Sequence, residues 1–112
     1  MIEEELYSHL SSEIDYKIYP MVAPADAIMP CLVYTSLLNQ DVQALQGDIC
    51  YSKAKLQLDC YAKSYSQVKA LASIVKDALY KFKYYPHSIT IIDDYEHDTK
   101  LYRQKIDFKI NT

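Results

Sequence analysis

The sequence predicts an α+β domain in which a four-stranded, mostly antiparallel sheet carries two helices packed on one face. Two observations lead to this fold class. Residues 53 to 82 change from an alternating apolar pattern to a helical one, and the segments 88–95 and 100–110 have strand-like compositions. With a helical N-terminal segment and a strand at 31–38, the predicted order is α-β-β-α-β-β. A chain of 112 residues is expected to form a single domain, residues 1–112.

The central strand is predicted from its alternation. Its apolar residues fall on one face: Ala54, Leu56, Leu58 and Cys60. Its polar residues fall on the other face: Lys53, Lys55, Gln57 and Asp59. Because successive side chains of a strand point to opposite faces, this strand should have one dry and one solvated face.

The segment that follows has the three- and four-residue spacing of a helix. Its apolar positions are Val68, Leu71, Ala72, Val75, Leu79 and Phe82. Ser64 is expected to cap the first turn, with Gln67 reaching back as in a capping box. Because the apolar stripe needs a cover, we expect this helix to lie across the dry face of the central strand.

The N-terminal part is predicted to hold one short helix and one proline-rich loop. Apolar residues spaced by four and three early glutamates indicate a helix over residues 2–12. Residues 16–19 allow a brief extended piece. Three of the four prolines lie within 20–30, so this segment is expected to be ordered but not helical. Its apolar residues Met21 and Val22 either pack beneath the helices or await a partner.

Three more segments complete the chain. Residues 39–48 are rich in turn residues and link the strand at 31–38 to the central strand as a projecting hairpin tip or a flexible loop. Residues 88–95 predict a strand. The last strand, 100–110, has one apolar face made by Tyr102, Ile106, Phe108 and Ile110.

Composition excludes several classes of protein. The net charge of -3 carries no basic excess, which argues against sequence-specific nucleic-acid binding. The acidic N-terminus is not typical of a signal peptide, and no segment approaches the roughly 20 apolar residues of a membrane span. Three cysteines is an odd number, and Cys50 and Cys60 would lie about 33 Å apart on one strand. Free thiols in a reducing cytoplasm are therefore expected.

Three groups of side chains have the chemistry of functional sites. The first is an acidic turn of metal-ligand types without any known ligand spacing, which favours a solvated turn: His87, Asp93, Asp94, Glu96, His97 and Asp98. The second is Cys31, Cys50 or Cys60 as a nucleophile beside a histidine, but Cys60 is predicted on the dry face and a single glycine leaves little backbone for an oxyanion loop. The third is Asp59, expected to pair with a neighbouring lysine. We therefore expect no enzyme activity, metal or cofactor.

Binding to other proteins explains the sequence better than catalysis or metal binding does. An open four-stranded sheet has two edges that must be covered, charged or paired. Apolar side chains in the segments 20–30 and 39–48 are easier to understand if assembly buries them. A heterologous contact between copies of one chain closes into a ring or continues as a filament.

Several short motifs follow one another in a definite order along the chain. After the N-terminal helix come Ile18-Tyr19-Pro20, Val22-Ala23-Pro24 and Pro30-Cys31-Leu32-Val33-Tyr34. The strand-to-helix segment is Leu56-Gln57-Leu58-Asp59-Cys60-Tyr61-Ala62, followed by Ser64-Tyr65 and Ala70-Leu71-Ala72. The last hairpin is Asp93-Asp94-Tyr95-Glu96 with residues 101–108. This order resembles the tail completion, or tail terminator, proteins of long-tailed phages and prophages over nearly the whole chain, although the family's glycine-rich turns are largely missing.

The resemblance implies a structural protein of the virion tail that assembles in the host cytoplasm. Such proteins form a homo-oligomeric, hexameric ring on the head-proximal end of the tail tube, stop its growth, and join it to the head or neck. The implied partners are the tail tube protein and the connector proteins, while DNA only passes through the lumen. The sheets of neighbouring subunits pair in that family, and neither a cofactor nor a membrane is involved.

Residue roles follow as hypotheses. Val42 and Leu45 would contact a neighbouring subunit or the tube, together with Met21 and Val22. The acidic residues would face the lumen, where like charge keeps DNA from adhering: Asp93, Asp94, Glu96 and Asp98. Two alternatives remain open at this point. One is a related head-tail connector component, and the other is a small cytoplasmic ligand-binding or enzyme domain with a pocket between sheet and helices.

Overall fold

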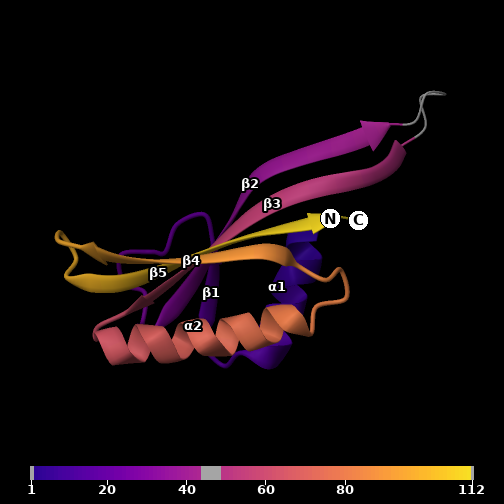
Figure 1. Ribbon diagram of the computed structural model, residues 1–112. Helices are drawn as coiled ribbons and strands as arrows, with labels where there is room; N and C mark the ends of the chain where they lie inside the picture. The colour runs from indigo at the N-terminus through magenta and orange to yellow at the C-terminus, as the bar shows by residue number, and fades with distance from the viewer. Residues whose placement is uncertain (1, 44–48, 112) are drawn as a thin grey trace.

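The computed structural model describes residues 2–43 and 49–111, and of residues 2, 39, 41–43 and 49–52 it describes the backbone alone (Figure 1). The elements, in chain order, are α1 (Ile2–Glu13), β1 (Lys17–Pro20), β2 (Cys31–Gln43), β3 (Ile49–Ala62), α2 (Tyr65–Tyr80), β4 (His87–Glu96) and β5 (Leu101–Asn111). The α+β class is therefore confirmed.

The sheet has five strands in the order β1-β2-β3-β5-β4. Strand β1 pairs with β2 in parallel, and the other three pairings are antiparallel. The prediction of a four-stranded, mostly antiparallel sheet was therefore wrong, because the sheet is five-stranded and mixed, and the order is α-β-β-β-α-β-β. The brief extended piece near residues 16–19 is a true strand, but four residues are too few to show a period of two.

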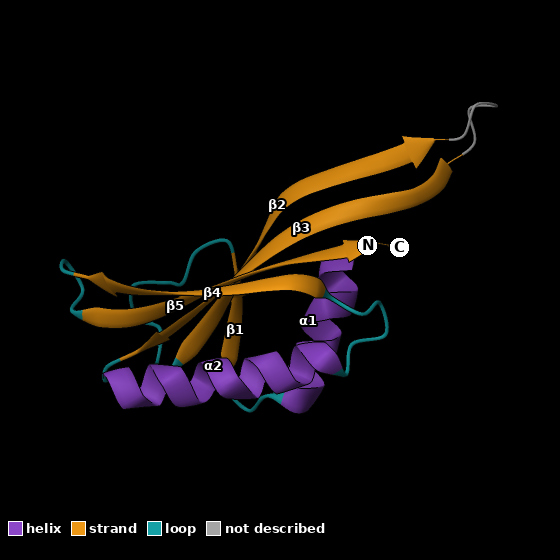
Figure 2. Ribbon diagram, in the orientation of Figure 1, coloured by secondary structure: helices purple, strands orange, loops and turns teal. Residues whose placement is uncertain are grey.

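Both helices cover the same face of the sheet (Figure 2). Helix α2 contacts β3 and β5, as predicted, and α1 packs against α2. Ser64 accepts a hydrogen bond from the Gln67 amide at 3.2 Å, which confirms the predicted cap. The largest buried side chains of the core come from both layers: Leu6, Leu10, Leu32, Leu56, Leu58, Leu71, Leu79, Ile106, Phe108 and Ile110.

The space between sheet and helices, where the alternative of a ligand-binding domain would place its pocket, is occupied by this core. Val68, Leu71 and Val75 of α2 are buried in one cluster with the apolar faces of β3 and β5. Apolar residues thus point to the helices at alternate positions of both strands, with the buried Gln104 of β5 as a polar exception, and the opposite face of the sheet carries most of the charged residues. We call that opposite face the open face.

Strands β2 and β3 extend past the rest of the sheet (Figure 1). Strand β2 continues to Gln43, and β3 begins at Ile49, whereas β5 pairs with β3 only from Lys53 onward. Residues 41–43 and 49–52 therefore form a two-stranded projection, here called the arm. It makes the molecule elongated, with extents of 52 × 26 × 22 Å. Residues 39–43, predicted as part of the connection, instead continue strand β2, because the strand is longer than the predicted 31–38. Residues 44–48 lie outside the described part, so the hairpin tip or flexible loop there stays a prediction.

Candidate assembly surfaces

The arm is the first candidate surface. A two-stranded hairpin alone is marginally stable in water, so an arm without a helix against it is typical of a segment that meets a partner. Val42 lies in β2 opposite Tyr51 of β3. Leu45, the second predicted contact residue, lies outside the described residues. At the base of the arm, where a register shift falls between Ser36 and Leu38, the side chain of Leu38 is half exposed.

The two sheet edges are the second candidate. Strand β1 pairs with β2 only over residues 31–34, so the outer edge of β2 is unpaired over residues 35–43 in the described part. On the opposite side, β4 is the last strand of the described sheet and pairs with β5, so its outer edge of ten residues is unpaired within the described chain. Ile91 and Ile92 of β4 are 39% and 49% exposed. Long, exposed and apolar edge strands are sites where another chain pairs.

The proline-rich loop 21–30 is the third candidate. It is held by backbone bonds, among them the Met21 amide to the Tyr34 carbonyl at 2.8 Å. Val22 and Ile28 are each 74% exposed and Met21 is 70% exposed, so these apolar side chains do not tuck beneath the helices. The loop lies over the open face at the end of the sheet where the β4–β5 turn is. A groove of about 430 Å³ separates it from Val33, Tyr61, Glu96, Thr99 and Leu101.

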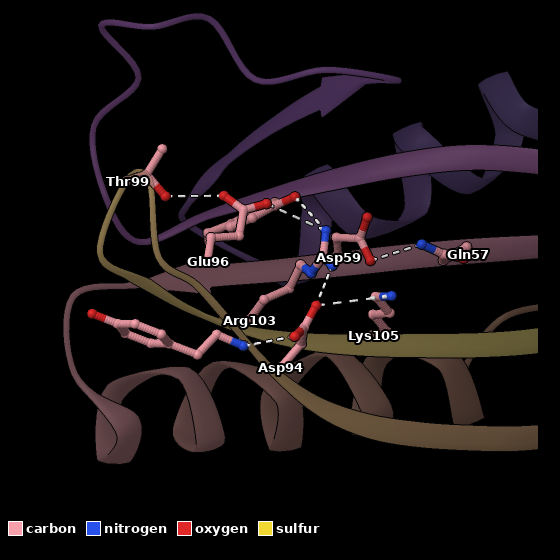
Figure 3. A network of polar contacts seen from close by, with 9 residues as sticks. Gln57, Asp59, Asp94, Glu96, Thr99, Arg103 and Lys105 are labelled. Atoms are coloured by element: carbon pink, nitrogen blue, oxygen red, sulfur yellow. Dashed lines mark hydrogen bonds and ion pairs between the residues drawn. The ribbon is translucent and has the colours of Figure 1, made fainter.

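Arg103 forms the centre of a polar network on the open face (Figure 3). Its guanidinium donates to Asp94, to Glu96 at 3.3 Å and to the Tyr61 hydroxyl at 3.3 Å. Burial opposes its charge, but the hydrogen bonds to Tyr61 and Asp94 outweigh burial and raise the pKa of Arg103. The same bond lowers the pKa of Asp94. The network fastens the β4–β5 hairpin to β3.

Asp59 occupies a different environment from the predicted one. It was expected on a solvated face beside a lysine, but its side chain is only 8% exposed. It accepts a hydrogen bond from Gln57 at 2.9 Å, and Lys105 lies opposite it in β5. Burial raises the pKa of Asp59, and the Gln57 bond and the Arg103 charge oppose that change. The open face is partly covered here, which an alternating pattern cannot reveal.

The four predicted acidic residues do not form one cluster. Asp94 and Glu96 lie on the open face with Arg103, whereas Asp93 points to the helix side. There Asp93 accepts from the Tyr65 hydroxyl at 2.9 Å and from Gln104, and lies 3.7 Å from the Lys69 ammonium. Asp98 is exposed in the β4–β5 turn. Neighbouring strand residues point to opposite faces, which explains the division.

Cys31 and Cys60 are free and buried, and burial raises the pKa of Cys31 to about 11 and that of Cys60 further. This agrees with the inert thiol expected at Cys60. Within residues 2–43 and 49–111, no group of three His, Cys, Asp or Glu side chains is placed to hold a metal ion. None of the described helices has the length and apolarity of a membrane span.

Sequence reasoning missed the pairing partners on the open face. The polar residues of β5 were assigned to one face, but Arg103 was not linked to Asp94 and Glu96. It also missed that Lys53, Lys55 and Lys109 lie together on that face, because the first two belong to β3 and the third to β5. The cross-strand register is the only signal that joins these residues, and a single sequence does not contain it.

An α+β domain with a helix-covered core, two unpaired strand edges, an arm and an exposed apolar loop belongs to the class of subunits that assemble with other protein chains. A sequence profile of the family described as Tail completion protein gp17 matches residues 5–112, and the chain belongs to that family. It is therefore a phage tail completion protein, a structural component of the virion tail. No individual curated protein matches the chain.

Proposed function

We propose that this protein is a tail terminator subunit that forms a ring, hexameric in the finished tail, on the head-proximal end of the tail tube. The ring stops tube growth and joins the tube to connector proteins of the head or neck. Its role is structural rather than enzymatic and needs no cofactor, and assembly takes place in the host cytoplasm. DNA passes through the lumen.

The pair of unpaired edges is the observation that carries this proposal. Along the sheet, β2, β3, β5 and β4 alternate in direction, so β2 and β4 run opposite ways. A second copy with the same orientation can therefore place residues 35–43 of its β2 antiparallel to β4 of the first. The two surfaces differ, so the contact is heterologous, and such contacts generate rings or filaments. One type of contact between copies would then pair both exposed edges of every subunit.

Solution mass tests the proposal most directly. We expect light scattering at increasing concentration to show a multimer, and electron micrographs of it to show a ring with a hole wide enough for duplex DNA. The same measurement is repeated with isolated tail tubes, because the tube end can act as the template. A chain that stays monomeric alone and also fails to bind tube ends contradicts the proposal.

The arm supplies a sharper version of the test. The double variant Val42→Asp with Leu45→Asp changes one residue of the arm and one outside the described residues. Because Val42 lies beyond the part of β3 that pairs with β5, the monomer should remain folded by circular dichroism. We expect it to lose ring formation or tube binding. Normal rings that still cap tubes would remove the arm from the proposed interface.

The lumen-facing role of the acidic residues stays a prediction. Arg103, Lys105 and Lys69 neutralise much of the charge on Asp93, Asp94 and Glu96, so Asp98 is the carboxylate that contributes most to an acidic lumen. Replacing all four by Asn or Gln should increase the retention of DNA on assembled rings. Unchanged retention would rule this role out.

A further inference from the structure

We propose that a basic groove on the open face, at the base of the arm, receives the loop 21–30 of a neighbouring copy. The groove measures about 510 Å³ and is lined by Leu38, Gln40, Lys53, Ala54, Lys55, His87, Lys109 and Asn111. This inference rests on the proposed ring and names the contact that the exposed loop makes in it.

The groove concentrates positive charge, and two of its lysines, Lys55 and Lys109, favour an anionic occupant. Lys55 of β3 lies directly opposite Lys109 of β5, and Lys109 lies opposite His87 of β4. Like charges directly opposite each other across strands are destabilising. No carboxylate in the described chain forms an ion pair with Lys55 or Lys109. An anionic occupant would relieve that repulsion.

The loop 21–30 has the complementary chemistry. Residues 21–52 contain no lysine or arginine, and the only charge in the loop is Asp26, which is exposed. Around it stand the exposed apolar side chains of Val22 and Ile28, which match the half-exposed Leu38 of the groove. This mixture of apolar contact and charge favours a polypeptide over the phosphate backbone of DNA, because phosphate groups offer no apolar surface for Leu38 to contact.

The two surfaces cannot meet within one subunit. The loop lies beside Leu101 at the start of β5, whereas the groove includes Lys109 near the end of the same strand. Eight residues of an extended strand separate them by about 26 Å, at roughly 3.3 Å per residue. A second copy must therefore supply the partner, and the resulting contact is heterologous, as a ring requires.

The strand register brings them together between copies. In one subunit, His87 at the start of β4 pairs with Lys109, Lys109 pairs with Lys55, and Lys55 pairs with Leu38 of β2. His87 and Leu38 therefore lie at the same level along the strand direction. For residues 35–43 of a second copy to lie along β4, that copy must slide about five residues toward the β4–β5 turn, so that its Gln43 reaches the level of His87. Its groove then lies alongside the end of the sheet that carries the loop 21–30.

Charge reversal on both sides tests the inference. We expect Lys55→Glu with Lys109→Glu to raise the concentration for half-assembly at least tenfold, and Asp26→Lys to raise it about fivefold. The combination of all three should return it to within threefold of the unmodified protein. A matched control reverses two lysines outside the groove, Lys63→Glu with Lys81→Glu, and should assemble normally. Thermal melts confirm that each variant folds.

Covalent trapping provides a measurement that does not depend on charge. In a Cys50→Ser background, Val22→Cys with Leu38→Cys should give a ladder of disulfide-linked oligomers on oxidation, because the two thiols can meet only between copies. Either cysteine alone should give no ladder above dimer. The native Cys31 and Cys60 are buried and do not compete.

The outcomes separate the two proposals. If the unmodified protein forms rings while the triple variant assembles no better than the double lysine variant, or the ladder is absent, the groove contact is wrong and the ring stands. If the lysine variant assembles normally but loses retention of duplex DNA, the groove is a nucleic-acid contact and the inference is overturned. If the unmodified protein neither assembles nor binds tubes, the ring proposal itself fails.

Discussion

Truncating the apolar side chains of the exposed loop gives a prediction whose size follows from the structure. Val22 and Ile28 are each 74% exposed in the monomer. Burying an entire side chain of this kind is worth about 1.5–3 kcal/mol, so a neighbour that covers the exposed part gains about 1–2 kcal/mol from each. Replacing both by serine should weaken the subunit contact by about 2–4 kcal/mol, which is roughly 30- to 700-fold in the dissociation constant.

The same variant should leave the monomer intact. Surface substitutions away from the core change the free energy of unfolding by about 0.5 kcal/mol or less. Sedimentation velocity over a concentration series measures the association, and urea unfolding measures the stability. The control is Tyr85→Asn, since Tyr85 is 79% exposed in the α2–β4 connection and its positive φ of 51° suits asparagine. It should assemble normally.

Three results would refute this reasoning. An unchanged assembly midpoint for Val22→Ser with Ile28→Ser would mean that no neighbour covers the loop. A loss of monomer stability of about 2 kcal/mol or more would mean that these side chains support the fold, contrary to their exposure. Equal weakening by the Tyr85 control would point to a general loss of surface apolarity rather than a contact at the loop.

Three further predictions concern the fold itself. Phe108→Ala, in the fully buried face of β5, should cost about 3–5 kcal/mol in urea unfolding, and a loss below about 1 kcal/mol would contradict the assigned core. Ser64→Ala removes the cap of α2 and should cost about 1 kcal/mol, with no change expected if the observed hydrogen bond contributes nothing. For Asp59, burial raises the folded pKa, so the folded state binds the proton more tightly and stability falls as pH rises from about 3.9 through the folded value. Asp59→Asn should therefore gain stability relative to the native protein across that window, and a gain that instead grows toward acid pH would oppose the assignment.

The central unit of the fold was predictable because two periodicities meet at Ser64. The alternation of Leu56, Leu58 and Cys60 and the helical spacing of Val68 and its successors each describe one buried face. Local pattern and tertiary packing agree there, so the strand, the helix, its cap and its position on the sheet were all correct.

Other parts depend on contacts between distant residues. Strand β1 is stabilised by its pairing with β2, and a four-residue segment that ends in Pro20 has no pattern of its own. Asp59 is buried by its neighbours on the open face, which are Gln57 and the β5 residues opposite. The alternating pattern of its own strand contains no information on those neighbours, so it predicted a solvent-exposed side chain. The acidic residues were grouped by proximity in sequence, whereas the pleat of β4 separates Asp93 from Asp94.

The main core cluster of this protein lies between the helices and one face of the sheet. Substitutions of exposed residues in the loop 21–30 and on the open face should therefore leave the fold largely intact, while substitutions at positions such as Leu58 or Phe108 act mainly on folding. The two sets of positions can change independently in evolution. A phage lineage that acquires a different tail could adapt its tail completion protein by altering the exposed set alone, which makes this fold easy to reuse among tails of different composition.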